Sequence, residues 1–491
     1  MSTVISAPKS GPGIGRPKMA TDIPACITTP DSVETRLGTL RFFDGLPDEE
    51  TVQKVFDNLD FQRGVQAFLT GLAAASAHAM RTGIRAFGPD NQTVLIAESL
   101  VDARSLFLTG NTETVYDVLW LDTKDGPLVV DVPPRVLGII TDFWYRYVTD
   151  VGNVGPDQGK GGKYLLLPPD HKGEVPDGYH VLHSRTYGNW MFFRGFIENG
   201  NLRTAVETAK AGFRVYRLDQ AASPPAMNFV NISGAVLNTI HANDVSFFQE
   251  VAAVVQEEPL EAVDPETRGL LASIGIQKGK PFDPDARMQQ ILTEAAAVGN
   301  ATARALVFHT RERKAYYYPN GAWKRWWIDD NFEFSPGGVL NLDGRIQYFY
   351  VGTGSSPVFS LKMIGKSSQY AWATQDAHGE YLDGGRSYRL HLPAGIPAAN
   401  FWSILVYDSQ TRSMLQTDQQ FPSVSSQKRE LLVNPDTSVD VYFGPTPPAG
   451  KEANWIQTVP GKGWWTVLRL YGPLEPWFDK TWRPGEIEQV P

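Results

Sequence analysis

Residues 111–122 read NTETVYDVLWLD, and this stretch decides the fold class that the sequence predicts. β-Branched and aromatic residues dominate it, as is typical of strands. Because successive side chains of a strand point to opposite faces, Glu113 and Asp117 share one face while Thr114 and Tyr116 share the other. We therefore predict a β-strand that begins with a ridge of polar side chains.

The same pattern continues outward from that strand, from Val94 to Leu218. Short runs rich in β-branched and aromatic residues are each bounded by Gly, Pro or Asp, which indicates strands separated by turns. One helix, over residues 202–212, interrupts the strands and ends at Gly212. We predict a first antiparallel β-sandwich-like domain over residues 91–220.

A second series of strands is predicted in the C-terminal third of the chain, after Trp323. Gly, Pro and Asp turns separate its runs, which are IQYFYVG, FSLKMIG, YAWATQD, YRLHLP, FWSILVYD, SVDVYFG and WWTVLRLYG. Their spacing is that of a strand plus a turn. The sequence thus predicts a second antiparallel β-sandwich-like domain over residues 323–491.

Helical periodicity precedes and separates these two domains. Apolar residues recur at three- and four-residue steps within residues 46–90, where we expect two consecutive helices. The same period fills a middle region, residues 221–322, in which Pro281 and Pro284 break the last helix from the others. Residues 1–45 have no sustained period and are expected to form an arm, either partly disordered or clasped on a neighbouring subunit. The predicted fold class is mainly β with helical segments (α+β): two antiparallel β-sandwich-like domains joined by a helical region.

Composition argues against two classes of partner. With a net charge of -9 and 20% charged residues, the chain has no broad cationic surface for a phosphate backbone, so we expect no nucleic-acid partner. No run of about 18 apolar residues occurs, so no membrane span is predicted. Residues 1–20 contain Gly and Pro where a secretion signal needs an apolar core, which makes the cytoplasm the default compartment.

The familiar catalytic signatures are absent from the sequence, including the P-loop, HExxH, GxSxG and paired CxxC motifs. Cys26 is the single cysteine and has no partner for an intramolecular disulfide. His180 and His183 would lie on opposite faces of a strand, so no metal site is predicted and the cofactor stays unknown. We interpret residues 155–162 and 376–385 as loops, although the carboxylates of the second loop are also suited to a hard cation.

The polar ridge supplies the candidate site. A carboxylate acid or base, hydroxyl donors and an aromatic wall lie close together there, with arginines downstream that could hold an anionic group. A loop or bulge is needed before the acid and the tyrosine can face one site. The same residues would also be found on a solvent-exposed edge strand that has no functional site. The candidate catalytic residues are Glu113, Tyr116 and Arg194, and the candidate substrate-binding residues are Asn111, Thr114, Arg185 and Trp190.

Longer strings in the sequence resemble one protein family. They are NTETxY followed by WLD, RTYGNWxxxR at 185–194, NFWSILVYD at 400–408, TRSML, GKEANWIQT at 450–458 and RLYGP at 469–473. Over roughly residues 60–485, the chain resembles bacterial proteins that join domain of unknown function 1254 to domain of unknown function 1214.

The resemblance implies two β-sandwich-like domains with helices between and beside them, often in homo-oligomers, and no settled reaction. Many relatives carry export signals, which implies a periplasmic location, whereas this chain shows no such signal. The family's usual motif at this position is Asn-x-Asp-Thr-x-Tyr. Glu113 therefore keeps the carboxylic acid of the Asp and adds one methylene.

Three functions remain open. The first is an enzyme, a hydrolase or lyase, that acts on a small organic or carbohydrate substrate. The second is a carbohydrate or small-ligand binding protein without chemistry, which uses aromatic residues of the C-terminal domain as stacking platforms. The third is a structural oligomer in which the arm and the tail at residues 475–488 clasp neighbouring subunits. A homo-oligomer is compatible with all three.

Overall fold

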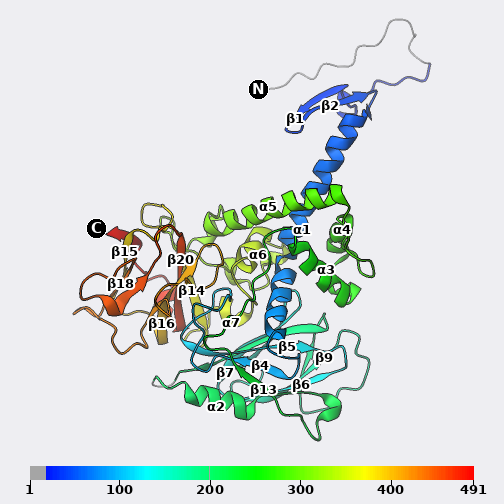
Figure 1. Cartoon of the computed structure of the whole chain (residues 1–491). Coiled ribbons are helices and arrows are strands. Elements are labelled where there is room, and N and C mark those ends of the chain that lie inside the picture. The colour runs from blue at the N-terminus through cyan, green and yellow to red at the C-terminus, as the bar shows by residue number, and fades with distance from the viewer. Residues whose placement is uncertain (1–17, 198–199, 491) are drawn as a thin grey trace.

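A computed structural model describes residues 18–197 and 200–490 of the chain. Its strands form several mostly antiparallel sheets, with helices between and beside them (Figure 1). The predicted fold class, mainly β with helical segments, is confirmed. Within the described ranges, no helix combines the length and the hydropathy needed to cross a bilayer.

The first β-domain contains two sheets that share one apolar core. The six-stranded sheet has the order β13 (Asn228–Asn231), β4 (Thr93–Ile96), β5 (Thr114–Asp122), β11 (Gly188–Phe196), β7 (Val136–Asp142) and β8 (Tyr147–Gly152). The four-stranded sheet has the order β10 (His180–His183), β9 (Gly162–Leu167), β6 (Leu128–Val132) and β12 (Arg214–Arg217). Val115 and Leu119 of the first sheet pack in the same core as Val130 and Leu166 of the second, and α2 (Arg203–Gly212) adds Val206 to it.

The second β-domain is built in the same way from two four-stranded sheets. One has the order β14 (Ser368–Ala373), β20 (Trp464–Pro473), β16 (Ala398–Asp408) and β17 (Ser423–Ser425). The other has the order β19 (Trp455–Gln457), β18 (Val439–Gly444), β15 (Ser387–Leu392) and β21 (Ile487–Val490). Short helix α8 (Glu475–Phe478) precedes β21, and Trp477 and Trp482 of the tail are buried in this domain's own core.

Residues 49–85 form one continuous helix, so the expectation of two consecutive helices is wrong. Helix α1 (Glu49–Arg85) has 37 residues and begins at Asp48, whose Oδ1 accepts a hydrogen bond from the Thr51 backbone N–H at 2.7 Å. Its small residues permit close packing: a Cβ added at Gly64 would lie 2.7 Å from the Ala295 Cβ. Gly64 therefore contacts another helix, and the chain does not end a helix there.

Helices α3 (Phe247–Glu257), α4 (Pro265–Ser273) and α5 (Ala286–Phe308) pack around α1, with α5 crossing it (Figure 1). Residues 233–246, which we expected to be helical, contain no helix. The break before α5 falls at the two prolines, as predicted from Pro281 and Pro284.

Two of the expected strands are not strands. The run IQYFYVG lies in α6 (Leu342–Phe349) and beyond, and the run FSLKMIG begins within α7 (Pro357–Ser360). Asn341 begins α6, because its Oδ1 accepts from the Gly344 backbone N–H at 2.8 Å. Ile346, Tyr348 and Phe349 are all buried. A helix that is buried on several sides shows no amphipathic period, so its sequence cannot be distinguished from that of a buried strand.

The N-terminal arm of the described chain is a small sheet of β1 (Ser32–Thr35), β2 (Gly38–Phe43) and β3 (Leu46–Pro47). It projects from the body at the start of α1 (Figure 1). Residues 1–17 of the arm, expected to be partly disordered, lie outside the described residues.

The two β-domains meet through the faces that their own cores leave free. Tyr116 and Trp190 of the six-stranded sheet belong to a third apolar core, together with Tyr370 and Trp465 of the sheet β14-β20-β16-β17. Residues of α1, α3 and α6 complete this core. Two sheets from different domains therefore enclose common space, and polar groups on their facing strands can reach one site.

Candidate functional site

A cavity of about 60 Å³ lies where the two domains face each other. We call it the interdomain cavity. Its walls are aromatic or apolar apart from two arginines, two threonines and the tyrosine hydroxyls, and the lining residues are Phe107, Leu108, Thr109, Tyr116, Ile139, Trp190, Phe192, Arg194, Trp326, Trp327, Tyr348, Thr353, Phe359, Tyr370 and Arg469.

Each domain contributes a cross-strand pair of arginine and tyrosine to this cavity. In the first domain, Arg194 of β11 pairs with Tyr116 of β5 in antiparallel register. In the second, Arg469 of β20 pairs with Tyr370 of β14. Directly opposed residues on antiparallel strands project to the same face, so each pair enters the cavity together.

Arg194 is held by the second domain. Its side chain is 2% exposed, and its Nη2 donates to the Ser368 Oγ of β14 at 2.9 Å. The guanidinium carbon lies 5.2 Å from the centre of the Tyr471 ring, which is within cation–π range. The Nε of Arg194 is buried without a hydrogen-bond partner in the protein.

Arg469 ties the second domain to the segment that leads into β5. Its Nη2 donates to the Thr109 carbonyl oxygen at 2.5 Å and to the Tyr407 hydroxyl at 2.7 Å. Its guanidinium carbon lies 5.3 Å from the centre of the Tyr370 ring. The Nε of this arginine is also buried and has no partner in the protein.

The interdomain cavity is cationic. Among residues 18–197 and 200–490, no carboxylate forms an ion pair with Arg194 or Arg469. Burial raises the pKa of Tyr116, which stays neutral. Guanidinium groups stay protonated in proteins, and a buried charge normally has a partner of opposite sign. Two guanidinium groups that have no ion-pair partner can therefore attract an anion.

Glu113 lies behind the cavity and does not line it. Its Oε1 accepts a hydrogen bond from the Thr112 Oγ1 at 2.6 Å, and that hydroxyl lies 2.9 Å from the Ser423 Oγ of the second domain. Burial raises the pKa of Glu113, while the Thr112 hydroxyl and the charge of Arg469 oppose the rise. Glu113 thus sits at the seam between the domains, with its charge coupled to the cavity through Arg469.

Asn111 and Thr114 shape the backbone that enters β5. The Asn111 Oδ1 accepts from the backbone N–H of Glu113 at 3.0 Å and from the Thr114 Oγ1 at 3.1 Å. The Tyr116 hydroxyl accepts from the Asn111 backbone N–H at 3.1 Å. These bonds make the turn that separates Glu113 from the strand and turns Tyr116 toward the cavity.

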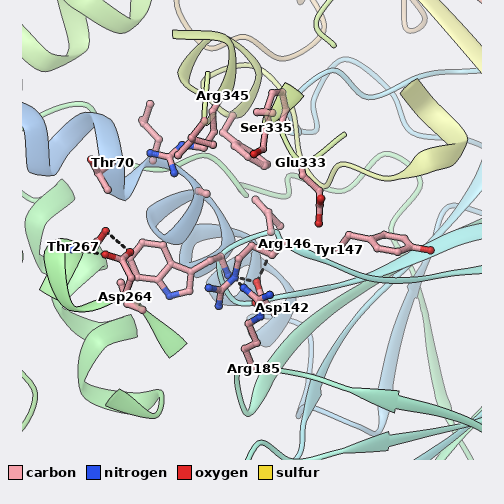
Figure 2. A pocket seen from close by; sticks show the side chains of 18 of the residues that line it. Thr70, Asp142, Arg146, Tyr147, Arg185, Asp264, Thr267, Glu333, Ser335 and Arg345 are labelled. Carbon is pink, nitrogen blue, oxygen red and sulfur yellow. Dashed lines mark hydrogen bonds and ion pairs between the residues drawn. The ribbon is translucent and has the colours of Figure 1, made fainter. Parts of the chain in front are cut away.

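Arg185 lies elsewhere, at the mouth of a second and larger concavity. This cleft of about 490 Å³ lies between the first β-domain and helices α1, α4 and α6, and Arg185 is exposed there (Figure 2). We call it the helix-side cleft.

The predicted site residues therefore fall into three groups. Tyr116, Trp190 and Arg194 line the interdomain cavity. Glu113, Asn111 and Thr114 lie beside that cavity, and Arg185 is separate from all of them.

The second domain's share of the cavity was missed by sequence reasoning. Arg469 and Tyr370 are far from Arg194 along the chain, and no spacing rule connects them. The only sequence feature that pointed to Arg469 was the string RLYGP, which begins with this residue. The sequence did not show whether its strand is buried or exposed.

The residues that the structure describes include no group of three or more His, Cys, Asp or Glu side chains able to hold a metal ion. In the acidic loop at 376–385, the Asp376 Oδ1 accepts from the backbone N–H groups of His378 and Glu380 at 2.9 and 3.0 Å. That carboxylate oxygen closes a turn.

Comparison with known proteins confirms the family resemblance. Residues 91–217 match the family model described as DUF1254, a protein of unknown function, and residues 367–475 match the one described as DUF1214, also of unknown function. No protein with a curated description matches the chain.

Two solved structures are similar to the chain. The crystal structure of the VPA0106 protein from Vibrio parahaemolyticus has a TM-score of 0.53 at 17% identity, and the alignment covers 88% of this chain and 100% of that one. A putative uncharacterized protein from Burkholderia cenocepacia has a TM-score of 0.41 at 13% identity, over 89% of this chain and 96% of that one. The first likeness shows a shared fold.

Proposed function

The chain joins a domain of unknown function 1254 to a domain of unknown function 1214, in that order, and we propose that the cavity between these domains binds a small organic anion such as a short carboxylate. The observation that carries this proposal is the pair of buried arginines, one from each domain, that share the cavity without a carboxylate partner among the described residues. A bound anion would supply the missing charge.

The donors suit a carboxylate. A guanidinium presents its N–H groups in a planar fork that matches the two oxygens of a carboxylate. Arg194 and Arg469 both line the cavity, and neither guanidinium is in an ion pair within the described residues. The rings of Trp190, Phe192 and Tyr370 would surround the ligand's apolar end.

The size of the cavity limits the ligand. Pockets for drug-sized molecules measure roughly 300–1,000 Å³, whereas the interdomain cavity measures about 60 Å³. That space holds only a few non-hydrogen atoms. We therefore propose a compact anion as the ligand in preference to a carbohydrate.

Replacing Arg194 with Gln should weaken anion binding. We expect formate or acetate to bind the native protein, and the variant to bind at least about 10-fold more weakly, because a hydrogen bond to a charged group contributes about 1.5–3 kcal/mol. Isothermal titration calorimetry with formate, acetate and neutral acetamide measures this effect.

The matched control for that experiment is Arg203→Gln. Arg203 belongs to the same domain but is exposed and paired with Glu207 on α2. It should bind acetate like the native protein. Equal acetate affinity in the Arg194→Gln variant, or no binding by the native protein, would refute the proposal.

A hydrolase or lyase reaction in the same cavity is a second candidate function. Its support is Glu113, a buried carboxyl whose pKa is raised by burial, as is common for groups that exchange protons in active sites. Arg469 would couple the protonation of Glu113 to the charge of a substrate. Glu113 would then act as general acid or base on a substrate held by Arg194 and Arg469.

Glu113→Gln should abolish turnover while leaving Arg194-dependent anion binding in place, because Gln keeps the shape of the side chain but cannot exchange a proton. Mass spectrometry of a complex metabolite mixture, incubated with native protein and with each variant, would detect substrate depletion. Depletion at the native rate by the Glu113→Gln variant would exclude this carboxyl as the acid or base.

We also propose that the arm mediates homo-oligomerisation. Phe43 and Leu46 on the projecting sheet are 81% and 67% exposed, and Phe56 on the neighbouring part of α1 is exposed as well. Apolar groups of this size on a projecting element favour contact with another subunit. The tail at residues 475–488 is a weaker candidate, since Trp477 and Trp482 pack within their own domain.

The double substitution Phe43→Ser with Leu46→Ser should reduce the mass of the assembly measured by light scattering after size exclusion. Val339→Ser, which alters an exposed apolar residue away from the arm, should leave the mass unchanged. A native protein that is monomeric, or a double variant of native mass, would contradict the arm's role.

A further inference from the structure

The helix-side cleft has the size of an organic-ligand site, and the interdomain cavity does not account for it. Its volume of about 490 Å³ falls within the range of roughly 300–1,000 Å³ that is typical of ligand pockets. Helix α1 and helix α6 border it, the end of β7 and the start of β8 form another side, and α4 closes a third.

Arg345 is a charged residue of this cleft whose side chain has no partner among the described residues. It belongs to α6 and is half-buried, and burial lowers its pKa while the charge of Asp264 opposes that change. A guanidinium nevertheless stays protonated at neutral pH. Within the described part of the chain, its side chain forms no hydrogen bond and no ion pair.

The carboxylates around Arg345 are engaged elsewhere. Asp264 caps α4, accepting from the Thr267 backbone N–H at 3.0 Å and from the Thr267 Oγ1 at 2.7 Å. Asp142 accepts from the Arg146 Nε at 2.6 Å in an ion pair across the turn after β7. Figure 2 shows Arg345 and Ser335 on one side of the cleft, with Arg185 and Asp142 on the opposite side. Glu333 is exposed.

Four largely buried aromatic residues also border the cleft. Trp144 and Tyr145 lie in the turn between β7 and β8, and Phe334 and Phe349 face them from the helical side. The Tyr145 and Phe349 rings are stacked with their centres 5.9 Å apart. Flat apolar walls of this kind favour a planar ring, and the hydroxyls of Thr70 and Ser335 add polar groups.

From these observations we infer that the helix-side cleft is a second binding site, which takes an aromatic carboxylic acid with its carboxylate on Arg345 and its ring against Trp144, Tyr145 and Phe349. Arg185, which is exposed, also lines the cleft. This site is separate from the proposed small-anion cavity, because Arg345 lines only the cleft whereas Arg194 and Arg469 line only the cavity.

Calorimetric titration with benzoate and phenylacetate tests this inference, with benzamide as the neutral analogue. We expect the native protein to bind benzoate and Arg345→Gln to bind it at least about 10-fold more weakly, since a charged hydrogen bond is lost. Benzamide should bind about as weakly as benzoate does to the variant. Arg345→Lys, which keeps the charge and loses the planar fork, should give an intermediate affinity.

Two control variants separate this site from its surroundings. Arg311→Gln removes an exposed arginine that pairs with Asp343 at the start of α6, and it should bind benzoate as the native protein does. Arg194→Gln should do the same. Absence of benzoate and phenylacetate binding at millimolar concentration, or native affinity in both Arg345 variants, would overturn the inference. Loss of benzoate binding in Arg194→Gln with retention in Arg345→Gln would also overturn it, because the acid would then occupy the interdomain cavity.

Discussion

Replacing Arg469 with Gln is expected to abolish anion binding in the interdomain cavity and to lower the free energy of unfolding by about 3 kcal/mol. The loss of binding follows because the cavity would keep only one of its two cations. The loss of stability follows because the Thr109 carbonyl and the Tyr407 hydroxyl would lose their donor. An unsatisfied buried polar group costs about 1–3 kcal/mol.

Replacing Arg194 with Gln should cost less stability than replacing Arg469. Arg194 donates one side-chain hydrogen bond, to Ser368, a hydroxyl that can turn to another partner. Removing Arg194 also relieves the desolvation of an unpaired buried charge, which offsets part of the lost bond. Both variants should therefore lose acetate binding, and Arg469→Gln should be the less stable of the two.

Urea denaturation of the native protein, Arg469→Gln and Arg194→Gln, each with and without acetate, measures both effects. Of these three proteins, acetate should stabilise only the native one, since a ligand that binds the folded state raises stability by RT ln(1 + [L]/Kd). Arg203→Gln again serves as the control. An Arg469→Gln variant that acetate still stabilises would mean that the anion does not require the second domain.

Much of the fold was readable from the sequence because most strands carry their own signal. β5, β11, β16 and β20 all coincide with runs that alternate or are continuously apolar between turn residues. Their burial on both faces suits continuous apolar letters. The expectations failed where burial hides the period, as in α6, and in the region rich in small residues, which continues α1 as one helix.

The candidate site was readable only in part, for a geometric reason. Tyr116, Trp190 and Arg194 belong to two adjacent strands, and an alternating pattern places side chains on one face of a sheet. Arg469 reaches them only through the docking of two domains, which local sequence does not encode. Arg185 precedes β11, whereas Arg194 lies near the far end of that strand, so their nearness in sequence was misleading.

Asp117→Asn is expected to stabilise the protein increasingly as the pH rises. Asp117 belongs to β5 and is buried, and neither of its carboxylate oxygens has a hydrogen-bond partner in the protein. Burial raises its pKa well above the ordinary value, and the charge of Lys210 opposes the rise only in part. The folded protein therefore holds a proton that the unfolded chain releases.

The sign of the pH dependence follows from that difference. Below about pH 4 the carboxyl is protonated in both states and adds no dependence on pH. As the pH rises toward the folded pKa, only the unfolded state ionises, and the native protein loses about 1.4 kcal/mol of stability per pH unit through this group. Asn cannot ionise, so the variant escapes this loss, and its advantage should be small at pH 4 and should grow as the pH rises toward the folded pKa.

Urea denaturation at pH 4, 6 and 8 measures the difference between the native protein and Asp117→Asn. Asp125→Asn, which alters an exposed acid in the turn between β5 and β6, is the matched control and should follow the native profile. Parallel profiles for the native protein and Asp117→Asn would show that the carboxyl ionises normally in the folded state. Diverging profiles would show that β5 holds a neutral acid in the first domain's core while it presents Tyr116, the preceding residue, to the cationic cavity on its other face.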